Sequence, residues 1–263
     1  MKNIDFKKLL VLIVIIAVAI LAILGAAKLF KNMGGPSKKV QEKIETRITE
    51  YYAKATIGHS TIFSGVDLLY DKDKVEVKDI KYGSMVELAI KYAEDNKIDL
   101  SVDNDDAAQL KDLIKVESVG YDAKKIREIV KDLFDVELPK ESFMATVDYV
   151  YNYYYIEKDD TLLKADSGVH NLATKESSLD FYPVSTKKGK EKDTYVTTVA
   201  VAYVYDSGYG VSYAKDKNGT TVVEKDLKEK KFPKEKVDEF TKYEFTTKKV
   251  GDNYVFVSVE KVK

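Results

Sequence analysis

The sequence contains no cysteine, and only two of its 263 residues, His59 and His170, are histidine. The absence of cysteine excludes disulfide bonds, thiolate zinc sites, cysteine nucleophiles and lipid attachment through a cysteine. Two histidines are too few for a histidine metal cluster, and no Gly-x-Ser-x-Gly motif supplies a serine nucleophile for either of them. We therefore expect a protein that is not an enzyme and that has no cofactor and no metal site.

Arginine is equally scarce, because Arg47 and Arg127 are the only arginines beside 41 lysines. Arginine supplies the planar fork that binds phosphate or carboxylate through two contacts, whereas lysine acts as a point charge. The net charge also disfavours the binding of phosphate groups, because residues 1–31 carry +4 but residues 32–263 carry −5. An acidic domain with little arginine is repelled by nucleic acid, so we expect no nucleic-acid partner.

A long apolar run extends from Leu9 to Ala27 and contains nineteen residues without a charge. As a helix it would be about 28 Å long, close to the bilayer core thickness of about 30 Å. We predict a cytoplasmic head over 1–8, a transmembrane helix over 9–29 that makes the lipid bilayer a partner, and a linker over 30–36. A cleaved signal peptide fits less well, because its apolar region is usually only about 7–15 residues long.

Lysines flank this span on both sides, so two signals compete over the orientation of the chain. Three lysines precede the span, whereas six basic residues from Lys28 to Arg47 follow it, which by itself favours a C-terminus inside the cell. Long C-terminal domains are, however, translocated largely regardless of charge, and a short basic head before a first span behaves as a signal-anchor. We therefore predict a single-pass cell-membrane protein whose C-terminal domain is extracytoplasmic.

The segment 37–142 has mainly the spacing of amphipathic helices. Apolar residues three to four positions apart predict a helix over 38–56. Ser84 and Glu87 have the spacing of a capping box, in which each side chain binds the other residue's amide, and they predict a helix over 85–96.

Two further segments of the helical part resemble each other. One begins at Asp106 and the other, sixteen residues later, at Asp122, and each has an aspartate before an amphipathic stretch. Aspartate is a favoured cap for the first amides of a helix. The two segments therefore predict a helical hairpin.

The segment 143–263 is rich in tyrosine and β-branched residues, with turn signals about every ten residues, which is typical of a sheet. Turns are expected at Asn218-Gly219 and Gly251-Asp252-Asn253, and a short helix is expected over 234–240. The predicted strands are Ala145–Glu157, Leu162–Ala165, Leu179–Ser185, Tyr195–Tyr205, Tyr209–Lys215, Thr220–Glu224, Tyr243–Val250 and Tyr254–Val262. The predicted fold is α+β, with an N-terminal transmembrane helix and then a helical segment packed on a curved, mainly antiparallel β-sheet.

Tyrosines recur at alternate positions near the start of this sheet, so Tyr149, Tyr151, Tyr153 and Tyr155 lie on one strand face. A tyrosine ring has a flat apolar body and a hydroxyl at its tip, a combination that suits a glycan or peptide ligand. We predict these four tyrosines as ligand-binding residues. The alternative is that the rings form the core of the sheet beneath the helices, with hydroxyls reaching its rim.

Two other classes of function remain open at this point. An envelope hydrolase would need a carboxylate pair that acts as acid and base, for which Asp148, Glu157 and Asp180 are the candidates. A structural subunit of a membrane assembly is suggested by Ala22 and Ala26, which form a small-xxx-small pair in the predicted span.

The order of anchor, helices and a curved sheet that closes in a long hairpin over Tyr243–Glu260 resembles a known type of protein. Mainly over residues 120–263, the chain is similar to uncharacterised membrane-anchored surface proteins of Gram-positive bacteria, some with cystatin-like or nuclear-transport-factor-like sheets. The resemblance assigns no role to any residue, because such sheets support binding, inhibition, assembly and catalysis alike. We expect an extracytoplasmic domain that binds a protein, a peptide or a cell-wall component.

Overall fold

The computed structural model describes residues 35–53, 74–102, 118–144, 151–166, 178–216, 219–226 and 231–262. The predicted membrane span over 9–29, the helix predicted to begin at Asp106 and both histidines lie outside these segments. No helix within the described segments is long and apolar enough to cross a membrane.

Most of the helices follow the spacing of apolar residues in the sequence. The described helices and helical turns are α2 (Lys38–Arg47), η1 (Ile48–Tyr52), η2 (Val77–Asp79), α4 (Tyr82–Asp95), α6 (Ala123–Phe134), η3 (Glu157–Asp159) and η5 (Lys234–Glu239). The helix predicted from residue 38 is confirmed as α2, which continues into the wider turns of η1. The helix predicted after Asp122 is confirmed as α6, because the Asp122 carboxylate accepts a hydrogen bond from the Lys125 amide at 3.0 Å.

The capping box predicted at Ser84 is wrong, although the helix itself is present. α4 begins at Tyr82, so Ser84 and Glu87 lie inside the helix and cap nothing. Both side chains are buried, because this side of the helix packs against other elements. Tertiary packing has therefore overridden a local signal.

The strands form two antiparallel sheets. They are β1 (Lys74–Glu76), β2 (Ser118–Asp122), β3 (Phe143–Met144), β4 (Tyr151–Ile156), β5 (Thr161–Asp166), β6 (Ser178–Lys188), β7 (Thr194–Asp206), β8 (Gly210–Ala214), β9 (Thr221–Asp226), β10 (Thr241–Val250) and β11 (Asn253–Lys261). The larger sheet has seven strands in the order β1-β11-β10-β7-β8-β9, with β6 also paired to β7, and the smaller has the order β2-β5-β4-β3. The predicted α+β fold with a mainly antiparallel sheet is confirmed.

The predicted strands from Leu162 onward are confirmed with small shifts at their ends. The first predicted strand is described only over Tyr151–Ile156, and the short helix predicted after Pro233 is the 3₁₀-helix η5. Sequence spacing did not predict β1, β2 and β3. β1 and β3 are too short to show an alternating pattern, and β2 lies in the segment expected to be helical. β2 nevertheless pairs along its whole length with β5, so the segment expected to be helical also contributes to a sheet.

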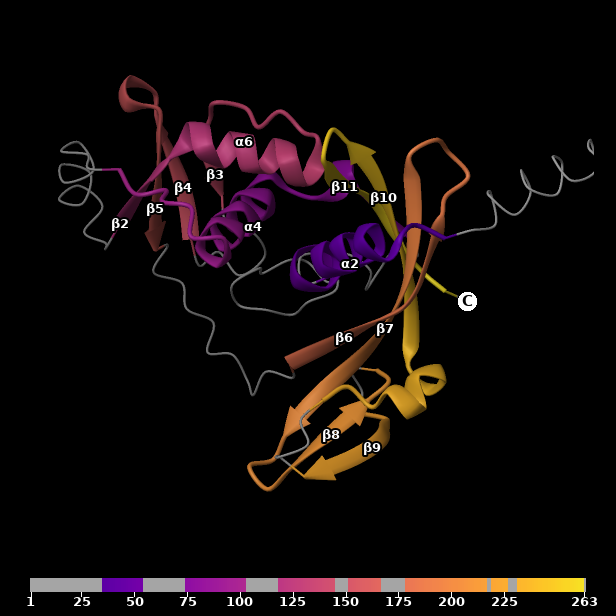
Figure 1. The fold of residues 1–263 in the computed structure, drawn as a ribbon. Helices are drawn as coiled ribbons and strands as arrows, with labels where there is room; N and C mark the ends of the chain where they lie inside the picture. The colour runs from indigo at the N-terminus through magenta and orange to yellow at the C-terminus, as the bar shows by residue number, and fades with distance from the viewer. Residues whose placement is uncertain are drawn as a thin grey trace, which may run out of the picture.

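The helices α4 and α6 lie between the two sheets (Figure 1). One apolar core joins these three layers and contains residues from α2, α4, α6 and both sheets. Phe245, Phe256 and Val259 from the larger sheet and Tyr153 and Leu162 from the smaller one are all buried in it. We call the face of the larger sheet that meets the helices its inner face, and the opposite face its outer face.

The long strand β7 is buried on both faces in its middle. Val199 and Val201 point into the main core, whereas Ala200 and Ala202 alternate with them into a second, smaller core on the outer face. The second core also contains Val204, Val211, Tyr213, Phe232 and Phe240. The small alanine side chains leave room there for the rings of Phe232 and Phe240, whose centroids lie 5.1 Å apart.

Hydrogen bonds from Arg47 connect the end of α2 with the β10–β11 hairpin and with α6. Its guanidinium donates hydrogen bonds to the carbonyl oxygens of Asp132 (3.0 Å) and Tyr254 (3.3 Å) and to the Asn253 side chain (3.0 Å). The nearby Tyr52 hydroxyl donates toward the carbonyl oxygen of Tyr254 at 2.7 Å. Burial raises the pKa of Tyr52, so its hydroxyl stays protonated and remains a donor.

Candidate functional site

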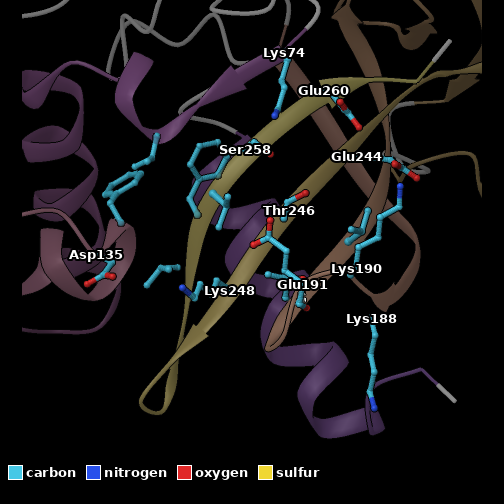
Figure 2. A pocket seen from close by; sticks show the side chains of 18 of the residues that line it. Lys74, Asp135, Lys188, Lys190, Glu191, Glu244, Thr246, Lys248, Ser258 and Glu260 are labelled. Atoms are coloured by element: carbon cyan, nitrogen blue, oxygen red, sulfur yellow. Dashed lines mark hydrogen bonds between the residues drawn. The ribbon is translucent and has the colours of Figure 1, made fainter. Parts of the chain in front are cut away.

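A groove of about 670 Å³ lies on the outer face of the larger sheet. We call it the outer groove. Its floor includes Thr246 from β10 and Ser258 from β11, and one wall is the β6–β7 hairpin with Lys190 and Glu191 (Figure 2). Asp135, which follows α6, lies on the opposite side (Figure 2). The outer groove is large enough for a small organic ligand or a short stretch of a polymer.

The outer groove follows from the alternation of side chains along β10 and from a bulge in its pairing. Glu244, Thr246 and Lys248 point outward, whereas Phe245 between them is fully buried in the main core. The β10–β11 register shifts between Thr246 and Thr247. A bulge of this kind bends the strand and increases its twist, which curves the sheet surface at this point.

Charges of both signs form a row across the outer groove, which we call the charge row. The strand registers place Lys74 opposite Glu260 and Glu260 opposite Glu244, and all three residues line the groove. At the far end of the row, Lys187 binds Glu244 with an Nζ–Oε1 distance of 3.1 Å. Opposite-charge neighbours offset the repulsion expected between two glutamates in facing positions.

At one end of the charge row, Lys74 and Lys78 both form ion pairs with Glu76 at the end of β1. Two hydrogen bonds lower the pKa of the Glu76 carboxylate. The one donated by Lys78 has the larger effect and the one donated by Lys74 the smaller. The hydrogen bond with Glu76 is likewise the main cause that raises the pKa of Lys74. Lys74 therefore stays protonated at neutral pH, and the row keeps a positive end.

The structure describes two side chains of the predicted tyrosine row, those of Tyr153 and Tyr155, and they share the face of β4 that meets the helices. Tyr149 lies outside the described residues, and Tyr151 is the first residue of β4. Tyr153 is fully buried in the main core, whereas Tyr155 packs at its edge. The ligand-binding role of the row stays a prediction.

Tyr155 takes part in a network at the end of the smaller sheet. Its hydroxyl donates to one oxygen of Asp160 at 2.9 Å, and Arg127 binds the other oxygen at 2.5 Å. Asp160 has a left-handed backbone with φ +48°, and its carbonyl oxygen accepts the Ala123 amide at the start of α6. Both arginines of the chain thus join a helix to another element.

The Arg127 hydrogen bond is the main cause that lowers the pKa of Asp160. The stabilisation from its charge is therefore present above the ordinary pKa of aspartate and is lost as pH falls through the lowered pKa. Asp160→Asn keeps the shape and tolerates the left-handed backbone, so we expect it to cost about 1 kcal/mol at pH 7. Urea unfolding should show the two proteins converging in stability as pH falls below the ordinary pKa of aspartate. An equal difference at pH 7 and at low pH would contradict this assignment.

Glu87 is buried inside the protein and Lys164 is half-buried, and their opposite charges act on each other, which sequence spacing did not reveal. Glu87 on α4 is only 5% exposed, and burial raises its pKa to about 7, against the opposing effects of Lys164 and the Tyr153 hydroxyl. Burial also lowers the pKa of Lys164, whose ammonium lies 5.9 Å from the centre of the Tyr153 ring. Neither charged residue lines the outer groove.

The carboxylates selected from the sequence are not brought together as a pair in the described residues. Asp148 lies outside them, Glu157 is exposed in η3 between β4 and β5 of the smaller sheet, and Asp180 is on β6 of the larger sheet. The outer groove instead holds Glu244 and Glu260, which the alternation within β10 and β11 places on the outer face. Their facing positions depend on the strand register, which is why sequence spacing did not select them.

Neither a metal centre nor a relative gives a further indication of function. Within the described segments, no three carboxylate or histidine side chains cluster closely enough to hold a metal ion. The chain matches no protein-family model, no curated protein and no solved structure.

Proposed function

We propose that this chain is a single-pass membrane-anchored protein whose α+β domain binds an extended ligand with charged groups in the outer groove. The observation that carries the proposal is the charge row, Lys74-Glu260-Glu244-Lys187, on a groove floor that also offers the hydroxyls of Thr246 and Ser258. Apolar residues of the same groove, among them Val196 and Val255, supply the surface on which a ligand backbone would rest.

A peptide with both ammonium and carboxylate groups matches the charge row better than a ligand of one sign. Five lysines and four carboxylates line the outer groove, so a purely anionic or purely cationic ligand would meet like charges as well as opposite ones. The stem peptides of a bacterial cell wall have this chemistry. We propose such a peptide as the ligand class of the extracytoplasmic domain.

Thr246→Phe tests the outer groove as the binding site. Its side chain is on the groove floor, so a phenyl ring there should weaken binding of a stem pentapeptide by about tenfold or more. The measurement is fluorescence polarisation of the labelled pentapeptide with the full chain in nanodiscs. Thr221→Phe is the control, because it adds the same ring to an exposed position on β9.

Three results would each decide the proposal. Weaker binding in Thr246→Phe alone supports it, and equal affinity in both variants refutes it. Cleavage of the pentapeptide that is lost in both Glu244→Gln and Glu260→Gln would support the hydrolase alternative instead, with a carboxylate pair different from the residues selected by sequence.

A further inference from the structure

Three segments that are far apart in the sequence meet where the described chain begins. They are residues 35–43, the β6–β7 hairpin 186–194 and the β10–β11 turn 248–253, and we call them together the basic end. A side chain added at Gly35 would lie 3.4 Å from the Thr186 carbonyl oxygen. The Lys249 amide donates to Asp193 at 2.8 Å, and the Lys43 ammonium donates to the Asp252 carbonyl oxygen at 2.5 Å.

The basic end concentrates positive charge in an otherwise acidic domain. Its three segments contain nine lysines and four carboxylates, and all thirteen residues are exposed. The basic end therefore carries +5, whereas the remainder of residues 32–263 carries −10. The nine lysines are Lys38, Lys39, Lys43, Lys187, Lys188, Lys190, Lys192, Lys248 and Lys249.

The basic end is also the part of the domain nearest to the predicted membrane span. Five residues separate the end of that span at residue 29 from Gly35, so the two positions are at most about 20 Å apart. β7 runs away from this end, and its thirteen residues at roughly 3.3 Å each place the β7–β8 turn about 40 Å away. Figure 1 shows that turn, beside β8, at the opposite end of the sheet from the β6–β7 hairpin.

We propose that the basic end docks on the headgroups of an anionic lipid bilayer. Lysines near a negatively charged membrane surface are attracted to it, while the acidic remainder of the domain is repelled, so the charge distribution orients the domain. The outer groove shares four lysines with this end, so docking would hold one end of the groove at the membrane surface. They are Lys187, Lys188, Lys190 and Lys248. This inference rests on the membrane anchor of the proposed function.

The absence of cysteine allows a direct test with the full chain in vesicles, because a single introduced cysteine can be labelled selectively. A donor dye at Asp252→Cys reports the basic end, and one at Tyr209→Cys, where the side chain is 94% exposed, reports the distal turn. The acceptor is a headgroup-labelled lipid. We expect higher energy transfer from position 252 in phosphatidylglycerol-containing vesicles than in pure phosphatidylcholine, falling as salt is added, with little change at position 209.

Removing lysines should reverse this result. The triple variant Lys188→Gln, Lys190→Gln, Lys192→Gln is expected to weaken docking by on the order of a hundredfold, and transfer from position 252 should fall to its value in neutral lipid. The matched control replaces Lys215, Lys231 and Lys261, which are exposed outside the basic end, and should keep the high transfer.

Other outcomes would overturn the docking. Equal energy transfer in both lipids would rule out docking and leave the anchor intact. Energy transfer that depends on protein density would also rule it out, because it would indicate contact between copies of the chain. Release of the chain from vesicles by an alkaline wash would overturn the anchor itself. Peptide binding in the outer groove is measured separately in neutral lipid, where no anionic headgroup competes for the lysines that line the groove.

Discussion

Replacing Lys164 with methionine should lower the free energy of unfolding by about 1 kcal/mol at pH 8. Without its positive neighbour the buried Glu87 carboxylate takes up a proton, and one pH unit above its pKa of about 7 that protonation costs about 1.4 kcal/mol. At pH 5 the cost should be much smaller, because a protonated Glu87 carries no charge to compensate. Urea unfolding of both proteins at the two pH values measures the difference.

The double variant Glu87→Leu, Lys164→Met is the control for this prediction. Replacing a whole buried ion pair with apolar side chains is often neutral or stabilising, so the double variant should be more stable at pH 8 than Lys164→Met alone. If the double variant were as unstable as the single one, the loss would come from packing of the Lys164 side chain and not from the orphaned carboxylate.

The pair also makes the wild-type protein sensitive to pH. Glu87 has a pKa of about 7 in the folded protein, which is above the ordinary value for glutamate. Its contribution to stability is therefore fully present below about pH 4.5 and is lost as pH rises through 7, by on the order of 3 kcal/mol. Glu87→Gln should lack this loss between pH 5 and pH 8, and an unchanged pH profile would contradict the assignment.

Arg47→Met should cost about 3 kcal/mol, since it removes the donor to two backbone carbonyls and one amide side chain at a largely buried site. Arg47→Lys should recover only part of this loss, because an ammonium lacks the planar fork that reaches three acceptors in different directions. Lys39→Met on the exposed side of the same helix is the control and should change stability by no more than about 0.5 kcal/mol.

Hydrogen exchange would localise the effect of Arg47. The Asp132 and Tyr254 carbonyls belong to α6 and β11, so the Met variant should lose protection at the end of α6 and in the β10–β11 hairpin. A uniform loss of protection across both sheets would indicate that Arg47 contributes to general stability without joining these elements.

Local patterns determined much of this fold from the sequence alone. Alternation of apolar and polar residues located the strands from β5 to β11, and Asp122 marked the start of α6, because each signal depends on residues close together in the chain. The apolar run of residues 9–27 and the separation of charge along the chain are likewise properties of the sequence.

Only the tertiary structure decided which of these residues meet. Glu87 had the spacing of a capping residue, yet packing buried it beside Lys164 from a strand 77 positions away. The alternation of the sequence placed Tyr153 and Tyr155 on one strand face. Whether that face is accessible to a ligand depends on the helices that cover it, and they bury Tyr153. The charge row exists because strand register sets Glu244 opposite Glu260 and Glu260 opposite Lys74. Register and burial depend on contacts between distant segments, which local spacing does not encode.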